Sequence, residues 1–231
     1  MGGSDEPGAD VPCGFSAAHY EQNLRRALDK GYRFPTFAEL ADQPDGAGVK
    51  PSCLLRHDVD VSLKWARRLA TIEVKLGVRS TFFIRLRANG YNALARSSMA
   101  VLWELATRGF EIGLHAEPQE GTGLRQQLVA EREILQMAVG REIAGLAIHR
   151  PKLNGELADD LWRRAGFRYE AGEQRFNSGR NFASDSNYLW KPECFCRLLE
   201  RGENVYACVH PVWYWSKPES AGKILSKLRA E

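Results

Sequence analysis

The sequence predicts a single-domain α/β fold, an irregular (β/α) barrel of about seven parallel strands. Short apolar runs alternate with helical patterns from residue 52 onward, and such repeats are typical of a parallel sheet covered by helices. The 231 residues suffice for one large domain with a substantial core. Polar residues follow most of the apolar runs, which favours a barrel because barrel active sites form at the carboxyl ends of the strands.

The N-terminal part is predicted to be a tail followed by a helix. Residues 1–12 are rich in Gly, Asp and Pro and are expected to be disordered, so that the domain spans 13–231. The first helix is predicted over 16–30, with Gly31 as its stop signal, and a loop follows at 43–48.

The remaining elements follow from the period of the apolar residues. Short apolar runs flanked by turn formers predict six strands: 52–55, 80–84, 109–114, 144–148, 167–169 and 205–209. Helical patterns lie between them at 62–76, 97–108, about 122–138, about 156–165 and, on both sides of the last strand, within 192–228. In the helix at 62–76, Trp65, Leu69, Ile72 and Leu76 form one stripe.

One segment, 172–185, has no clear periodicity. It is long, irregular and rich in Asn, Ser and Gly. Long loops in compact domains often have a functional role, so this segment is interpreted as a lid or substrate-selecting loop, or else as a disordered excursion.

Composition excludes several classes of function. A formal charge of +3 without a dense Lys/Arg block argues against nucleic-acid binding. The N-terminus lacks the features of a secretory signal, and no segment approaches the ~18 apolar residues that span a bilayer. We therefore expect a soluble cytoplasmic protein without a membrane partner. No Gly-rich phosphate loop follows the first strand, which argues against a dinucleotide cofactor.

The five cysteines do not predict a cysteine metal site or a disulfide framework. Three of them, Cys53, Cys208 and either Cys194 or Cys196, lie in or near apolar runs, where a thiol behaves as a small core residue. Cys194-Phe195-Cys196 is not a Cys-x-x-Cys pair, and no second pair completes a zinc knuckle.

Asp58 and Asp60 are the most informative pair of residues. Residues two apart on a strand point to the same side, so these carboxylates should lie together after the first strand. Adjacent carboxylates repel unless a cation or a shared proton relieves them. The pair indicates a metal site or an acid/base pair; the alternative is a pair of helix-capping aspartates on a solvated turn.

Three of the five histidines end apolar runs: His115, His149 and His210. A single histidine after a strand is usually a hydrogen-bonded structural residue. Three of them are harder to explain in that way, because the carboxyl ends of parallel strands meet on one face. We expect them to lie near Asp58 and Asp60. His57 is expected to be a structural imidazole that faces away from the aspartates.

With these residues in view, the stretch from Leu54 to Tyr214 resembles the polysaccharide deacetylase (NodB-homology) superfamily, in its branch with a His-Asp-Val-Asp motif. Candidates for all five family motifs occur in the family's order: 57–60, 110–115, 149–151, 184–190 and 210–214. The resemblance implies a polysaccharide-deacetylase-like (β/α) barrel for the domain.

The resemblance also implies roles for individual residues. Asp58 would be the catalytic base, Arg150 would hold it, and His210 would be the general acid with Asp185 favouring its charged form. Asp60 and His115 would bind the metal ion. Tyr188, Trp190 and Trp213 would form a wall for a sugar ring; the alternative is that the tryptophans are core aromatics.

The chain departs from the family pattern at two positions. Val59 separates aspartates that are usually adjacent, and Gln119 stands where a second metal-binding histidine is usual. An amide oxygen is a poorer ligand for a transition metal than imidazole, so His149 is predicted as the third ligand. Glu117 and Gln119 are the other candidates, unless Glu117 is a solvated loop charge.

The function implied is that of a metal-dependent N-deacetylase with one divalent ion, zinc foremost, with cobalt, nickel and iron as alternatives. The substrate expected is an N-acetylated sugar or a sugar-like small molecule. Two alternatives are a hydrolase of another small amide and a non-catalytic carbohydrate-binding relative. The sequence predicts no oligomeric state.

Overall fold

The structure is a computed structural model that describes residues 14–43, 51–118, 123–150 and 159–215. The expected disordered tail, Gln119 and the helix predicted after the last strand lie outside the described residues.

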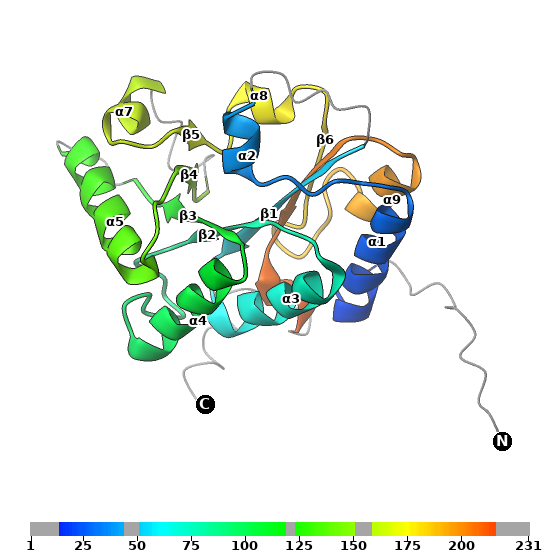
Figure 1. Ribbon diagram of the computed structural model, residues 1–231, viewed down its shortest axis with the longest axis horizontal. Helices are drawn as coiled ribbons and strands as arrows, with labels where there is room; N and C mark the ends of the chain where they lie inside the picture. Colours follow the sequence, from blue (N-terminus) through cyan, green and yellow to red (C-terminus); the bar gives the residue numbers. More distant parts are fainter. Residues whose placement is uncertain (1–13, 44–50, 119–122, 151–158, 216–231) are drawn as a thin grey trace.

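Seven parallel strands form one curled sheet, a half-barrel with the order β5-β4-β3-β2-β1-β7-β6 (Figure 1). The strands are β1 (Cys53–Val59), β2 (Thr81–Ile84), β3 (Glu111–Ala116), β4 (Gly145–Ile148), β5 (Tyr169–Glu170), β6 (Asn181–Ser184) and β7 (Val205–Val209). The fold class predicted from the sequence is confirmed. Because β5 and β6 are the two edges, the described strands do not close into a complete barrel.

Helices cover the outer side of this sheet (Figure 1). They are α1 (Ala17–Asp29), α3 (Leu63–Leu76), α4 (Arg96–Thr107), α5 (Leu124–Val139), α7 (Asp159–Arg164) and α9 (Phe195–Glu200). Two short helices, α2 (Phe37–Ala41) and α8 (Gln174–Asn177), lie near the opposite face, and a 3-10 turn, η1 (Pro211–Tyr214), follows β7. None of the described helices has the length and apolarity needed to cross a membrane.

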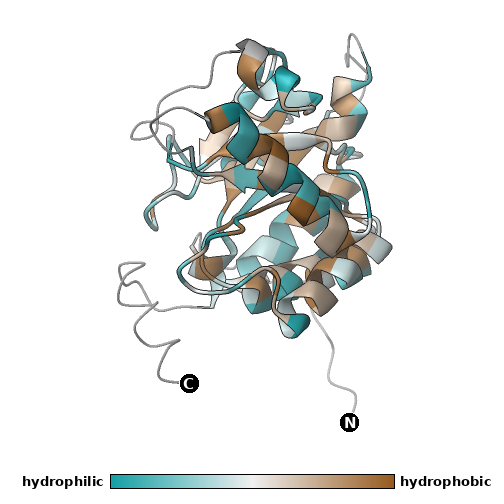
Figure 2. Ribbon diagram, turned by 90° about the vertical axis from the view of Figure 1, so that its left-hand side faces the viewer, coloured by the Kyte–Doolittle hydropathy of each residue, from teal (hydrophilic) through white to brown (hydrophobic). Residues whose placement is uncertain are grey.

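The outer helices form because each has one apolar stripe that the sheet buries. In α3 the buried positions include Leu63, Ala66 and Leu69, which recur at helical spacing. The helix ends at Gly77, whose φ of +68° is left-handed and suits glycine best. The outer helices show teal and brown residues along the same ribbon in Figure 2, as amphipathic helices do.

The concave face of the sheet has its own small core. Phe37 from α2 and Phe176 from α8 pack there against Phe83 and Tyr169. Gly145 makes room for this layer, because a Cβ atom at this position would meet the ring of Tyr169 at 1.9 Å. The layer fills the interior of the half-barrel and leaves its carboxyl edge to polar side chains.

Substituting Gly145→Ala should therefore destabilise the fold. The added methyl group would displace the Tyr169 ring, which donates a hydrogen bond to Glu111. Overpacking of this kind costs about 1–3 kcal/mol, measurable as a lower midpoint in urea denaturation. Gly172→Ala is the matched control, because its Cβ would meet only the flexible carboxylate of Glu170. An equal effect of the two substitutions would contradict this explanation.

The interpretation of 172–185 as one irregular segment was wrong. The segment contains α8 and the edge strand β6, which pairs in parallel with β7. Its first two strand residues, Asn181 and Phe182, are exposed, so β6 lacks the apolar run that identified the other strands. The short helix α2 was also missed, although Thr36 and Glu39 form a capping box at its start.

Candidate active site

The polar residues singled out in the sequence meet at the carboxyl edge of the sheet. Asp58 lies near the end of β1, and Asp60 follows that strand by one residue. His115 is the second-last residue of β3, whereas His149 and His210 come directly after β4 and β7. This is the convergence expected when parallel strands end on one side of a sheet.

Asp60, His115 and His149 form a three-residue group that could hold a metal ion. Their ligand atoms all lie within 4.8 Å of one another. The Nε2 atoms of His115 and His149 are each 3.4 Å from Oδ1 of Asp60. Two ligands at ~2.1 Å from an ion in tetrahedral geometry are about 3.4 Å apart, so the spacing fits zinc or a similar ion.

The hydrogen bonds of the two imidazoles also favour a cation. The Nδ1 of His115 is 3.1 Å from the carbonyl oxygen of Ala147, which can only accept, so Nδ1 carries the hydrogen. Likewise the Nδ1 of His149 donates to the Glu117 carboxylate at 3.3 Å. Both Nε2 atoms then turn lone pairs toward Oδ1 of Asp60, which is buried without a hydrogen-bond partner among the described residues. Three acceptors facing one point need a proton or a metal ion between them.

The titration of these residues suits metal binding near neutral pH. Burial lowers the pKa of His149 to about 4, so its imidazole is neutral. Burial alone would raise the pKa of Asp60, but the neighbouring imidazoles, His115 foremost, lower it to about 2. Near neutral pH the site therefore offers an ionised carboxylate and the neutral imidazole of His149.

Glu117 lies behind His149. Its carboxylate contacts Nδ1 of His149 and pairs with Arg85 at 2.6 Å, and its side chain is 41% exposed. A carboxylate in this position fixes the orientation of a metal-binding imidazole and makes the other nitrogen more basic. Of the two candidates for the third ligand that the structure describes, His149 is the one whose nitrogen joins Asp60 and His115.

Asp58 is held by an arginine of its own strand. Nε and Nη2 of Arg56 donate to the two carboxylate oxygens of Asp58 at 2.6 and 2.8 Å. Burial would raise the pKa of Asp58, but the charge of Arg56 lowers it well below its usual range. Arg56 also donates to the hydroxyl group of Tyr206. Asp58 is thus a fixed carboxylate, 3.5 Å from Nε2 of His115.

The structure corrects the prediction that Arg150 holds Asp58. His149 points into the site, whereas Arg150 is exposed and has a left-handed φ of +49°. Arg56 takes the contact instead. Residues two apart on a strand point to the same side, which is how Asp58 was paired with Asp60. The same spacing would have predicted the contact with Arg56, which also lies two residues from Asp58 on the strand.

Arg56→Lys should lower the deacetylation rate by roughly 10–100-fold, because lysine keeps the charge but cannot hold both carboxylate oxygens in one plane. Arg150→Lys is the matched control and should leave the rate within about twofold, since no described contact joins Arg150 to Asp58. Rates of acetate release from the metal-loaded variants measure both effects. A larger loss in Arg150→Lys than in Arg56→Lys would restore the original assignment.

His210 is paired with Asp185, which follows β6. Its Nδ1 lies 2.6 Å from Oδ1 of Asp185, and its backbone N–H donates to the same carboxylate. Burial would lower the pKa of His210, but the charge of Asp185 raises it to about 9. The other nitrogen, Nε2, is 4.0 Å from Asp58 and 3.9 Å from Asp60. A protonated imidazole therefore faces the two aspartates.

His57 lies on the other face of β1, as expected. Its Nε2 is 2.7 Å from Glu73 of α3, and its ring stacks on Phe82.

Cys208 was interpreted as a core thiol; it is buried, and its thiol also contacts Asp58 at 3.6 Å.

The three aromatic residues predicted to bind substrate lie in the cluster between the sheet and α1, α3 and α9. Tyr188 packs edge-on against Trp213 at a ring distance of 5.6 Å, and Trp190 stacks on Phe15. Trp213 is buried, which favours the alternative of a core aromatic for that residue, whereas Tyr188 and Trp190 are half-buried.

Comparison with known proteins bears mainly on the fold. No protein-family model and no curated protein matches the sequence. Among solved structures, the chain is similar to the Streptococcus pyogenes deacetylase PplD in complex with acetate, with 15% identity, a TM-score of 0.50 and coverage of 90% of this chain and 85% of that one. The peptidoglycan deacetylase PdaC from Bacillus subtilis gives 15% identity, a TM-score of 0.51 and coverage of 79% and 85%.

A third similar structure is a mutant, with restored enzymatic activity, of a CE4 family pseudoenzyme from Bacillus anthracis. It gives 15% identity and a TM-score of 0.50 and covers 79% of this chain, which spans 64% of that one. At these identities the likeness shows the fold that the resemblance to polysaccharide deacetylases predicted.

Proposed function

We propose that this protein is a metal-dependent N-deacetylase that acts on an N-acetylated sugar or a sugar-like small molecule. The observation that carries the proposal is the convergence of three possible metal ligands with a fixed carboxylate and an imidazole paired with a buried aspartate. Asp60, His115 and His149 would hold zinc or a similar divalent ion. When bound, the ion would lower the pKa of a water molecule from ~15.7 toward ~7 and polarise the acetyl carbonyl group.

The side chains around that position supply the proton transfers. Asp58 accepts the proton of the attacking water, and Arg56 keeps this carboxylate in one orientation through its two hydrogen bonds. His210 donates a proton from Nε2 to the leaving amine nitrogen. Asp185 keeps His210 in the required charged form. Tyr188 and Trp190 are the half-buried aromatic residues proposed to stack on the sugar ring.

Asp185→Asn should slow deacetylation and shift its pH dependence. Asp185 raises the pKa of His210, so its loss should lower that pKa and bring the alkaline limb of kcat to lower pH. The acid would then be partly deprotonated at neutral pH, with a rate loss of about 10–100-fold that lessens as the pH falls. A pH profile of kcat checks this, and an alkaline limb unchanged by the substitution would contradict the role of Asp185.

The rival functions make different predictions for one experiment. Purified protein loaded with zinc is offered a panel of N-acetylated sugars and simple N-acetyl amides, and released acetate is measured before and after chelation. We expect zinc-dependent release from acetylated sugars. Release from other amides alone would favour the alternative of a hydrolase that acts on another small amide. Sugar binding without any release would favour a non-catalytic carbohydrate-binding protein.

A further inference from the structure

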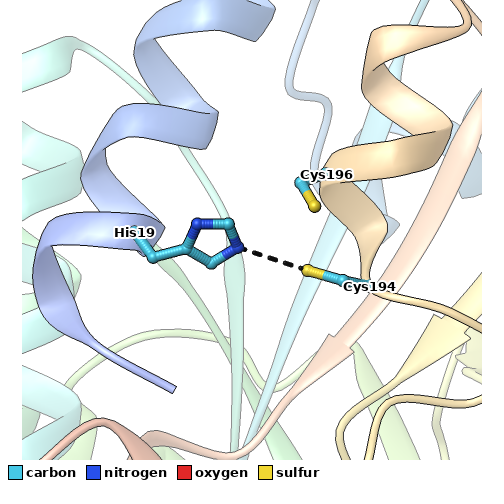
Figure 3. Close-up of side chains that lie close together, drawn as sticks. All are labelled: His19, Cys194 and Cys196. Atoms are coloured by element: carbon cyan, nitrogen blue, oxygen red, sulfur yellow. Dashed lines mark hydrogen bonds between the residues drawn. The ribbon is translucent and has the colours of Figure 1, made fainter. Parts of the chain in front are cut away.

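One histidine and two cysteines that the proposed reaction does not use meet between α1 and α9. His19 lies on α1, Cys194 is the N-cap residue of α9, and Cys196 is in its first turn. Figure 3 shows the three side chains close together in the space between the two helices, with Nε2 of His19 at 3.4 Å from Sγ of Cys194. Their donor atoms all lie within 4.8 Å of one another, and each residue is at most 5% exposed.

We propose that His19, Cys194 and Cys196 bind a second metal ion, a thiophilic divalent cation of the zinc class, which ties α1 to α9. Thiolate and imidazole are the ligands that select such ions over magnesium or calcium. Charge supports a divalent ion, because two thiolates and a neutral imidazole exactly balance two positive charges. A neutral complex can be buried in the surrounding apolar cluster without the cost of an uncompensated charge.

The contacts of His19 define the tautomer of its ring. The side-chain amide of Asn23 donates to Nε2 at 3.0 Å, so Nε2 is unprotonated, and a metal ion bound there would replace this hydrogen bond. Nδ1 is buried without a hydrogen-bond partner among the described residues. Nδ1 therefore carries the ring hydrogen, which is the tautomer in which Nε2 can bind a metal ion.

The site also has the space and access that a metal needs. Two sulfur atoms bound tetrahedrally to zinc at ~2.3 Å are about 3.8 Å apart, so rotation of the short side chains must draw the donors together by about 1 Å at most. A pocket of about 210 Å³ between the two helices is lined by Asn23 and Cys196 among others. It gives an ion a route to Cys196 and leaves room for water as the fourth ligand.

Cobalt binding to the full-length chain tests the proposal. The background carries Asp60→Ala and His115→Ala, which remove the active-site donors, and is kept reduced. We expect one equivalent of Co²⁺ to bind with a thiolate-to-metal charge-transfer band in the near ultraviolet, and Zn²⁺ to displace it. Adding Cys194→Ser, Cys196→Ser or His19→Gln should weaken binding on the order of 100-fold, with circular dichroism checking the fold.

The matched control is Cys53→Ser, which removes a buried thiol outside the cluster and should keep the band. Absence of the band in the background, or an unchanged band in Cys194→Ser, would overturn the proposal. A second measurement needs no substitution. X-ray absorption of the unsubstituted chain loaded with two equivalents of zinc should show sulfur at ~2.3 Å, and a spectrum with only nitrogen and oxygen neighbours would also overturn it.

Discussion

Replacing His115 by alanine is expected to remove the metal ion from the active site and to abolish acetate release. The imidazole is buried and held through Nδ1 by the carbonyl group of Ala147, so the substitution removes a donor that the fold holds in place. The substitution leaves only Asp60 and His149 as donors. Substituting a residue that hydrogen-bonds to a metal ligand costs about 10–100-fold in metal affinity. Loss of the ligand itself should therefore lower the affinity at least ~100-fold. Metal titration measures this.

The measurement is cleanest in a Cys194→Ser background, so that the metal count reports the active site alone. His210→Ala is the matched control: it lies at the same edge of the sheet but outside the three-donor group. It should keep the ion and lose turnover. Full metal occupancy in His115→Ala would show that the proposed site is wrong.

Asp58→Asn is expected to keep the ion and to lose catalysis by about 10²–10⁴-fold, because an amide cannot accept the proton of the attacking water. The amide oxygen can still accept a hydrogen bond from Arg56, so the fold should survive. Steady-state kinetics with the metal-saturated variant measure the loss.

Asp60→Asn provides the matched comparison, since the same chemical change is made two residues away. An amide is a poor ligand for a transition metal, so this variant should lose the ion first and the activity with it. Excess zinc should restore part of the activity of Asp60→Asn and none of that of Asp58→Asn. The reverse pattern would exchange the roles of the two aspartates.

Much of the fold could be predicted because its strands are buried on both faces and form continuous apolar runs. The strand β6 could not, because it is an edge strand whose exposed residues, Asn181 and Phe182, have the composition of a loop. The helix α2 has only five residues, and its burial depends on Phe37 packing against aromatic residues of the concave face. Such contacts have no local signal in the sequence.

The site was predictable where strand ends determine position. Asp58, Asp60, His115, His149 and His210 all lie where the alternation of strands and helices places them. The assignment of Arg150 followed the family motif rather than the strand geometry, and the structure gives the contact to Arg56. The meeting of His19 with Cys194 depends on the packing of two helices 175 residues apart, which no spacing in the sequence indicates.

The most direct test of the proposed active site is a crystal structure of the zinc-loaded protein, with diffraction recorded on both sides of the zinc absorption edge. We predict an anomalous peak between Oδ1 of Asp60 and the Nε2 atoms of His115 and His149, with zinc–nitrogen distances of ~2.0–2.1 Å. Asp58 should lie beside the peak, still paired with Arg56. No peak between these three donors, or an imidazole of His149 turned away from the ion, would contradict the account.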